Sequence, residues 1–215
     1  MTLKLNGSSS GSVSIDAPAS TTGGADVTFK LPVADGTSGQ SLTTNASGQL
    51  AFSSICDRDQ STGGQSIGTG TTYEYTPGIP DTAKIIYLTF DNVSCDGTDK
   101  IRMQLGTASA YTTSGYANMV GYASNGASVS MEEQTTYIGI PHSGWGGASN
   151  NFSGYFQFVN HVDNKWMYSG HITEPDEVYM QFNHGFIDVD IKRFKFYLSG
   201  SNSFDSGTVN CTWIS

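Results

Sequence analysis

The sequence has little charge, and most of its charged residues are acidic. Only 13% of its 215 residues are Asp, Glu, Lys or Arg, with a net charge of −9, whereas about 25% is usual in soluble domains. Because an acidic surface repels phosphate groups, we expect neither a nucleic-acid partner nor adsorption to anionic lipid.

Long apolar segments are also missing. No stretch approaches the roughly 20 apolar residues of a membrane-spanning helix, so we expect no membrane insertion. Residues 1–20 lack the order of basic, apolar and cleavage-site segments that is typical of a secretory signal. We therefore expect synthesis in the cytoplasm.

Cysteine is scarce: the chain has Cys56, Cys95 and Cys211, with no CxxC pair. This spacing excludes a zinc ribbon and a thioredoxin-like motif. We interpret the three as reduced thiols that pack as small apolar residues. A Cys95–Cys211 disulfide would require their two strands to be neighbours.

The abundant residues favour β-structure. Gly contributes 26 residues, Ser and Thr are frequent, and aromatic residues reach 12%. This composition suits strands joined by tight turns, and no useful helical periodicity is present. The fold class predicted is therefore all-β.

Residues 1–55 contain short runs of alternating apolar residues separated by Gly- and Ser-rich turns. This pattern predicts short β-ribbons that form an extended, stalk-like module. These ribbons have too few large side chains to offset their conformational entropy alone. We therefore expect their apolar faces to pack against other chains. The predicted assembly residues are Val27, Phe29, Leu31, Leu42, Leu50 and Phe52.

Residues 56–71 are polar and Gly-rich, which predicts a linker. Residues 72–215 contain eight to ten strand-like runs, which predicts an antiparallel β-sandwich of jelly-roll type. The most apolar run, residues 84–90, is expected at the centre of a sheet. Trp166 and Trp213 lie in strong strand runs and are expected in the core.

Three motifs resemble those of a known group of proteins. Residues 36–42 carry G-x-x-G-Q-x-L, residues 94–106 carry S-x-x-G-T-D-x-I-x-x-Q-L-G, and residues 204–210 read Phe-Asp-Ser-Gly-Thr-Val-Asn. Together the chain resembles tail fibres and other virion structural proteins of tailed phages, often of marine and cyanobacterial hosts.

This resemblance implies a non-enzymatic virion protein that is assembled in the host cytoplasm. It implies a homo-oligomer, a trimer of intertwined ribbons, in which residues 1–55 dock on other virion proteins and residues 72–215 form an exposed knob. The leading hypothesis is a tail fibre, and the alternative is a decoration protein of the capsid surface.

Acidic and histidine residues give only weak signals for chemistry. The loop Asp96–Asp99 lacks the spacing of a calcium loop and is explained by a β-turn. Glu132–Glu133 and Asp176–Glu177 are adjacent pairs, and adjacent strand residues face opposite sides. His142, His161, His171 and His184 are expected in loops or at strand ends. We therefore expect no catalytic residue, metal or cofactor.

One Gly-rich segment, residues 141–152, suggests a binding loop. Trp145 stands among its glycines, where an indole is hard to bury and can stack on a sugar face. Tyr111, Tyr116 and Tyr122 lie in a similar Gly- and Ser-rich region. These four residues are the predicted contacts for a host-surface glycan. The competing interpretation is that Trp145 closes the end of the domain or a subunit interface.

Overall fold

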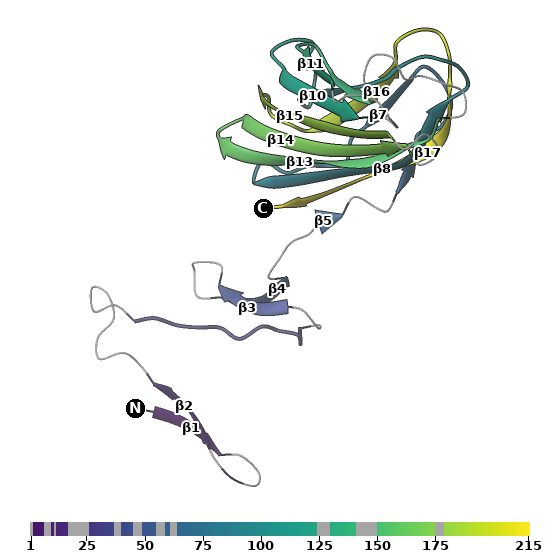
Figure 1. Cartoon of the computed structure of the whole chain (residues 1–215). Helices are drawn as coiled ribbons and strands as arrows, with labels where there is room; N and C mark the ends of the chain where they lie inside the picture. Colours follow the sequence, from purple (N-terminus) through teal and green to yellow (C-terminus); the bar gives the residue numbers. More distant parts are fainter. Residues whose placement is uncertain are drawn as a thin grey trace. The chain divides into compact units, whose positions relative to one another are not determined.

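The computed structural model describes residues 2–6, 10, 12–16, 26–36, 40–44, 49–54, 59–60, 64–123, 130–140, 150–174 and 179–215. Within these ranges every regular element is a β-strand, which confirms the predicted fold class (Figure 1). The chain divides into two compact units, Met1–Cys56 and Asp57–Ser215.

The first unit consists of two small antiparallel hairpins and an extended segment. Strand β1 (Thr2–Asn6) pairs with β2 (Ser12–Asp16), and β3 (Gln40–Thr44) pairs with β4 (Leu50–Ser54). The extended segment, residues 26–36, meets the second hairpin where Leu50 N donates to Lys30 O over 2.8 Å. No sheet of this unit has more than two strands among the described residues.

The second unit contains the remaining strands. Their bounds are β5 (Asp59–Gln60), β6 (Gln65–Ser66), β7 (Thr72–Tyr75), β8 (Ile85–Cys95), β9 (Ile101–Gly106), β10 (Ala117–Ala123), β11 (Ser130–Gln134), β12 (Ile138–Ile140), β13 (Phe152–Val162), β14 (Lys165–Glu174), β15 (Tyr179–Asp188), β16 (Arg193–Leu198) and β17 (Phe204–Ile214).

These strands form a nine-stranded and a four-stranded antiparallel sheet. The larger sheet runs β11-β10-β15-β14-β13-β8-β17-β5, with β6 also paired to β17, and the smaller runs β12-β9-β16-β7. Strand β8 lies between β13 and β17, so the most apolar run is central as expected. The structure differs from the predicted linker at residues 56–71, because β5 and β6 lie there and pair with β17.

The two sheets face each other across one aromatic core. The rings of Phe90 on β8 and Phe196 on β16 lie 6.5 Å apart, and those of Phe158 on β13 and Phe194 on β16 lie 5.9 Å apart. Burial alternates residue by residue along β14 and β16, which is the pattern of strands with one face in the core. Trp166 and Trp213 are buried, as predicted.

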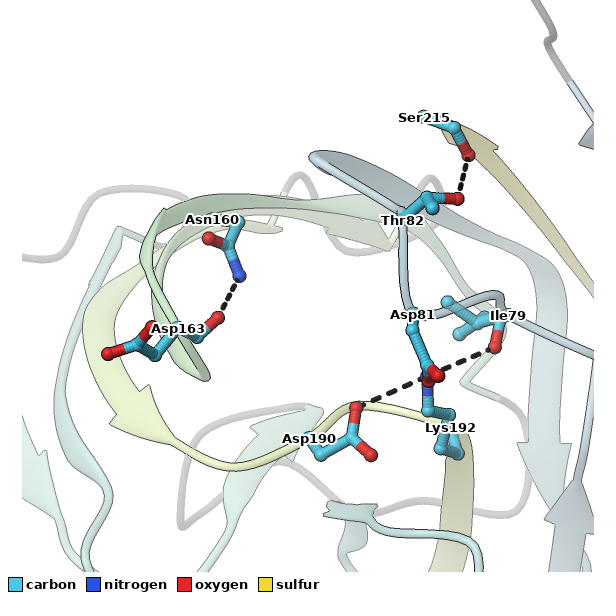
Figure 2. A network of polar contacts seen from close by, with 8 residues as sticks. All are labelled: Ile79, Asp81, Thr82, Asn160, Asp163, Asp190, Lys192 and Ser215. Atoms are coloured by element: carbon cyan, nitrogen blue, oxygen red, sulfur yellow. Dashed lines mark hydrogen bonds and ion pairs between the residues drawn. The ribbon is translucent and has the colours of Figure 1, made fainter.

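A polar network fastens one end of this core (Figure 2). Lys192, in the segment between β15 and β16, donates from Nζ to Asp81 Oδ1 over 2.6 Å and to Ile79 O over 3.3 Å. The same ammonium lies 3.2 Å from Asp190 Oδ1. Residues 79 and 81 belong to the connection from β7 to β8, so one lysine joins two connections that are far apart in sequence.

Amide side chains close the free edge of β12. Gly139 N donates to Gln134 Oε1 over 2.8 Å, and Gly139 O accepts from Gln181 Nε2 and Asn183 Nδ2. Asn118 Nδ2 in turn donates to Gln134 Oε1. All four amide side chains are buried, and they supply partners that a further strand would otherwise provide.

Candidate functional site

The structure describes three of the four predicted glycan contacts, and these three differ in their burial. Trp145 lies outside the described residues. Tyr116 is 2% exposed, and its hydroxyl accepts from Leu105 N over 2.8 Å and donates to Thr112 O. This burial removes Tyr116 from the residues that can touch a ligand. Tyr122 is half-buried and packs against the core.

Tyr111 is the one described member of the set that joins other binding-type side chains. It follows β9 and lies over the outer face of the four-stranded sheet, where the Arg193 guanidinium is 4.3 Å and the Lys195 ammonium 4.7 Å from its ring centre. Gly106 makes room for this ring, because a Cβ there would lie 2.8 Å from Tyr111 Cδ1.

The contacts around Tyr111 continue across the sheet. Lys195 Nζ also lies 5.3 Å from the ring centre of Tyr197, and the Arg102 guanidinium lies 4.5 Å above the ring of Tyr137. Arg102 is opposite Tyr197 in the β9–β16 register. Cations and tyrosine rings alternate in this row of six residues. We call it the tyrosine–cation stripe: Arg193, Tyr111, Lys195, Tyr197, Arg102 and Tyr137.

The three cations of the stripe form no ion pair among the described residues, although Glu74 is opposite Lys195 in the β7–β16 register. The two ion pairs of the described residues both belong to Lys192. The Nε atoms of Arg102 and Arg193 are buried and have no hydrogen-bond partner within the described ranges. Burial, followed by the charge of Glu74, raises the pKa of Tyr111 to about 12, so its ring stays neutral at physiological pH.

Sequence motifs do not reveal the stripe, because its residues are far apart in the sequence. Arg102 on β9 and Tyr197 on β16 are 95 positions apart and become neighbours only through strand pairing. A signal was nevertheless present. Arg193, Lys195 and Tyr197 alternate with buried Phe194 and Phe196, so polar and aromatic side chains share one strand face.

The carboxylates of the loop after β8 accept hydrogen bonds from backbone N–H groups. Asp99 Oδ2 accepts from Asn202 N over 2.8 Å, and Asp96 Oδ1 accepts from Ser203 N over 2.8 Å. These carboxylates therefore hold the β16–β17 connection. Among the residues that the structure describes, no group of three or more His, Cys, Asp or Glu gathers as a metal site.

The other acids and histidines are dispersed. Glu132 and Glu133 lie on the edge strand β11, and Asp176–Glu177 and His142 fall outside the described residues. His161 lies near the end of β13. His171 and His184 lie within β14 and β15, which corrects the expectation of loops or strand ends.

Cys95 and Cys211 are buried and are not bonded to each other. Burial is the largest cause that raises the pKa of each thiol. The structure therefore holds no Cys95–Cys211 disulfide, and both residues fit the interpretation of thiols packed in the core. Cys56 lies outside the described residues.

The predicted assembly residues of the first unit expose their apolar side chains. Exposure reaches 62% for Phe29 and 76% for Leu31, and the nearby Val33, which is outside the predicted set, is 106% exposed. Leu42, Phe52 and Val27 are exposed as well, and Leu50 is half-buried. A hollow of about 590 Å³ opens among residues 32–35, 40 and 49–52.

The packing of Phe52 explains one glycine of the G-x-x-G-Q-x-L motif. A Cβ at Gly36 would lie 2.6 Å from the Phe52 ring, so a larger residue would displace that ring. The motif thus shapes a local contact within the ribbon while most of its apolar surface stays open.

Within the described residues, the structure contains no helix that is long and apolar enough to cross a membrane. Comparisons with protein-family models, curated proteins and solved structures find no match. The functional assignment therefore depends on the geometry of the chain and on the sequence motifs.

Proposed function

We propose that the chain is a structural component of a phage virion, a homotrimeric tail fibre whose N-terminal ribbons attach it to the particle. The observation that carries the proposal is the exposed apolar surface of the ribbons, at Phe29, Leu31 and Val33 above all. Three copies could bury this surface in a shared core, which would supply the hydrophobic free energy that one copy lacks.

The motif resemblance supports the same role. It covers residues 36–42 in the ribbon module as well as residues 94–106 and 204–210 in the larger unit. In this proposal residues 1–55 form the stalk and dock on other virion proteins. Residues 72–215 form an exposed knob of jelly-roll type without catalytic activity, cofactor or metal, and the location is the virion after assembly in the host cytoplasm.

Multi-angle light scattering of the full chain tests the assembly. We expect about three times the mass of one 22.9-kDa chain at micromolar concentration. The double variant Phe29→Ser, Leu31→Ser should shift the mass toward one chain because it removes the apolar contact. Thr28→Ala, an exposed polar position beside them, should leave the mass unchanged. A monomeric wild type would refute the proposal.

Electron microscopy of labelled virions tests where on the particle the protein lies. Gold-labelled antibodies against residues 72–215 should mark the tail tip of intact virions. Labelling of the head would favour the alternative of a capsid-surface decoration protein, and particles without label would exclude a virion role.

A second candidate function is recognition of a host-surface glycan, and the tyrosine–cation stripe favours it. Tyrosine rings stack on the apolar faces of sugars, and guanidinium groups bind carboxylates with two parallel hydrogen bonds. The chemistry of the stripe fits a polysaccharide that carries uronic acids, since three cations gather there in a chain of net charge −9.

Calorimetric titration with oligogalacturonate tests this candidate. We expect binding that weakens with salt and falls at least tenfold in Arg102→Gln. Lys165→Gln, which removes a positive charge from β14 in the other sheet, should bind as the wild type does. Equal binding to neutral dextran, or equal loss in both variants, would exclude recognition through the stripe.

A further inference from the structure

The outer face of the nine-stranded sheet exposes large apolar side chains. Along β15 the residues Phe182 and Phe186 are exposed, while Gln181 and Asn183, which flank Phe182, are buried. The same outward face continues on the neighbouring strands. We call its seven exposed residues the methionine–aromatic face: Met119, Met131, Tyr155, Met167, Met180, Phe182 and Phe186.

Strand register makes this face continuous. Tyr155 on β13 is opposite His171 on β14, and His171 is opposite Phe182 on β15. Their rings touch in sequence, with centres 5.6 Å apart for Tyr155 and His171 and 5.0 Å apart for His171 and Phe182. A second row places Met167 opposite Phe186.

The face is large compared with ordinary exposed patches. The seven side chains are between 40% and 65% exposed, which amounts to roughly 700 Å² if a fully exposed large side chain offers about 200 Å². The largest apolar patch on a typical monomer covers about 300–600 Å². A stable protein interface buries about 800 Å² on each partner, so this face comes close to one complete side of an interface.

Its charge and composition indicate what covers it. Glu133 on the edge strand β11 is opposite Met119, and Lys165 and Asp188 are opposite each other at strand ends. The Lys165 ammonium lies 5.4 Å from the ring centre of Phe186, so formal charge enters the face from these margins. Two copies of net charge −9 repel each other over most of their surfaces. They can approach more closely through the row Tyr155, His171 and Phe182, which contains no Asp, Glu, Lys or Arg.

Methionine and aromatic side chains are also the residues enriched in protein interfaces. Methionine adapts its shape to a partner, and its sulfur is only a weak hydrogen-bond acceptor, which suits a glycan poorly. A depression of about 500 Å³ between β10, β14 and β15, lined partly by Met119, Met167 and Phe186, gives a partner side chain a place to insert.

We propose that the methionine–aromatic face packs against a second copy of this chain, as a knob-to-knob contact in addition to the ribbons. The proposal rests on the self-assembly described under the proposed function. It adds a separate contact surface in the second unit, so the two can fail independently.

Methionine oxidation of the full chain tests the contact. After a short peroxide treatment, mass spectrometry gives the oxidation rate of each methionine. In an uncovered chain Met119 and Met167 oxidise quickly, because they are 45% and 51% exposed, whereas Met103 is fully buried and serves as the internal control. In the assembly we expect both exposed methionines to oxidise at least tenfold more slowly than in the urea-unfolded chain.

Phe186→Glu places a carboxylate opposite Met167 in the β14–β15 register. We expect it to accelerate oxidation of Met119 and Met167 at least fivefold while the mass set by the ribbons is retained. Slow oxidation of Met103 in the variant shows that the fold is intact. Val162→Glu, an exposed apolar position at the tip of the β13–β14 hairpin, should leave the rates unchanged.

Each other outcome overturns the contact. A multimer in which Met119 and Met167 oxidise as fast as in urea keeps the ribbon assembly and leaves the face free for a different partner. A monomer with fast oxidation removes both proposals. If Met119 and Met167 oxidise slowly in a monomer, or if Phe186→Glu has no effect on their rates, something other than a second copy covers the methionine–aromatic face.

Discussion

Two buried tyrosines, Tyr116 and Tyr168, differ in the hydrogen bonding of their hydroxyls. The Tyr116 hydroxyl accepts from Leu105 N on β9 and so completes a backbone group that has no strand partner there. Tyr168 is also buried, but its hydroxyl has no hydrogen-bond partner within the described ranges. Burial raises the pKa of both hydroxyls, so both rings stay neutral.

We expect Tyr116→Phe to destabilise the chain by about 1–3 kcal/mol, because it leaves a buried N–H without an acceptor. Tyr168→Phe is the matched control and should be neutral or slightly stabilising, since the hydroxyl it removes has no partner to lose. Urea unfolding followed by tryptophan fluorescence measures both. Equal destabilisation in the two variants would contradict this assignment.

At the scale of elements, the ammonium of Lys192 links the β7–β8 connection to the β15–β16 connection. Burial lowers the pKa of Lys192, but the hydrogen bonds that its ammonium donates to Asp81 and Asp190, and their charges, outweigh burial and raise that pKa above its ordinary value. The hydrogen bond and charge of Lys192 in turn lower the pKa of Asp81 below 3.8. The contact is therefore charged on both sides through neutral pH.

Replacing Lys192 by Met should lower the urea midpoint at pH 7, because it removes the contacts to Asp81 and to Ile79 O. A carboxyl with a lowered pKa stabilises the fold above its unfolded value and loses this effect as pH falls. The difference between wild type and variant should therefore shrink below pH 3.8. Lys84→Met, at an exposed lysine, should change little, and a pH-independent difference would argue against the ion pair.

For the whole molecule, the two units differ in how they reach stability. The buried apolar core runs from Ile67 to Trp213 and belongs entirely to the second unit among the described residues. The first unit instead presents Phe29, Leu31 and Val33 to solvent. One unit contains its own hydrophobic core, and the other has no comparable core among the described residues.

A chain truncated to residues 57–215 should therefore unfold cooperatively at nearly the midpoint of the same unit in the full protein. Circular dichroism in urea measures this. Because the ribbons are removed, light scattering should show a lower oligomer mass than the full chain gives. Loss of cooperative unfolding would mean that the larger unit needs the ribbons to fold.

Sequence patterns predicted the elements whose burial alternates strongly. The runs around Trp166 and residues 84–90 were placed correctly because apolar alternation reports the core face directly. The β5 and β6 strands were missed, because two-residue strands in a Gly-rich segment carry no periodicity. The tyrosine–cation stripe depends on the β9–β16 register, which long-range packing sets and local pattern does not.

The amide side chains that bind Gly139 on β12 have a consequence for contacts between molecules. An open strand edge is a template for β-augmentation, by which neighbouring molecules polymerise through their backbones. At Gly139 both backbone groups are already engaged by Gln134, Gln181 and Asn183. A neighbouring molecule therefore cannot add a strand at Gly139 unless these hydrogen bonds break.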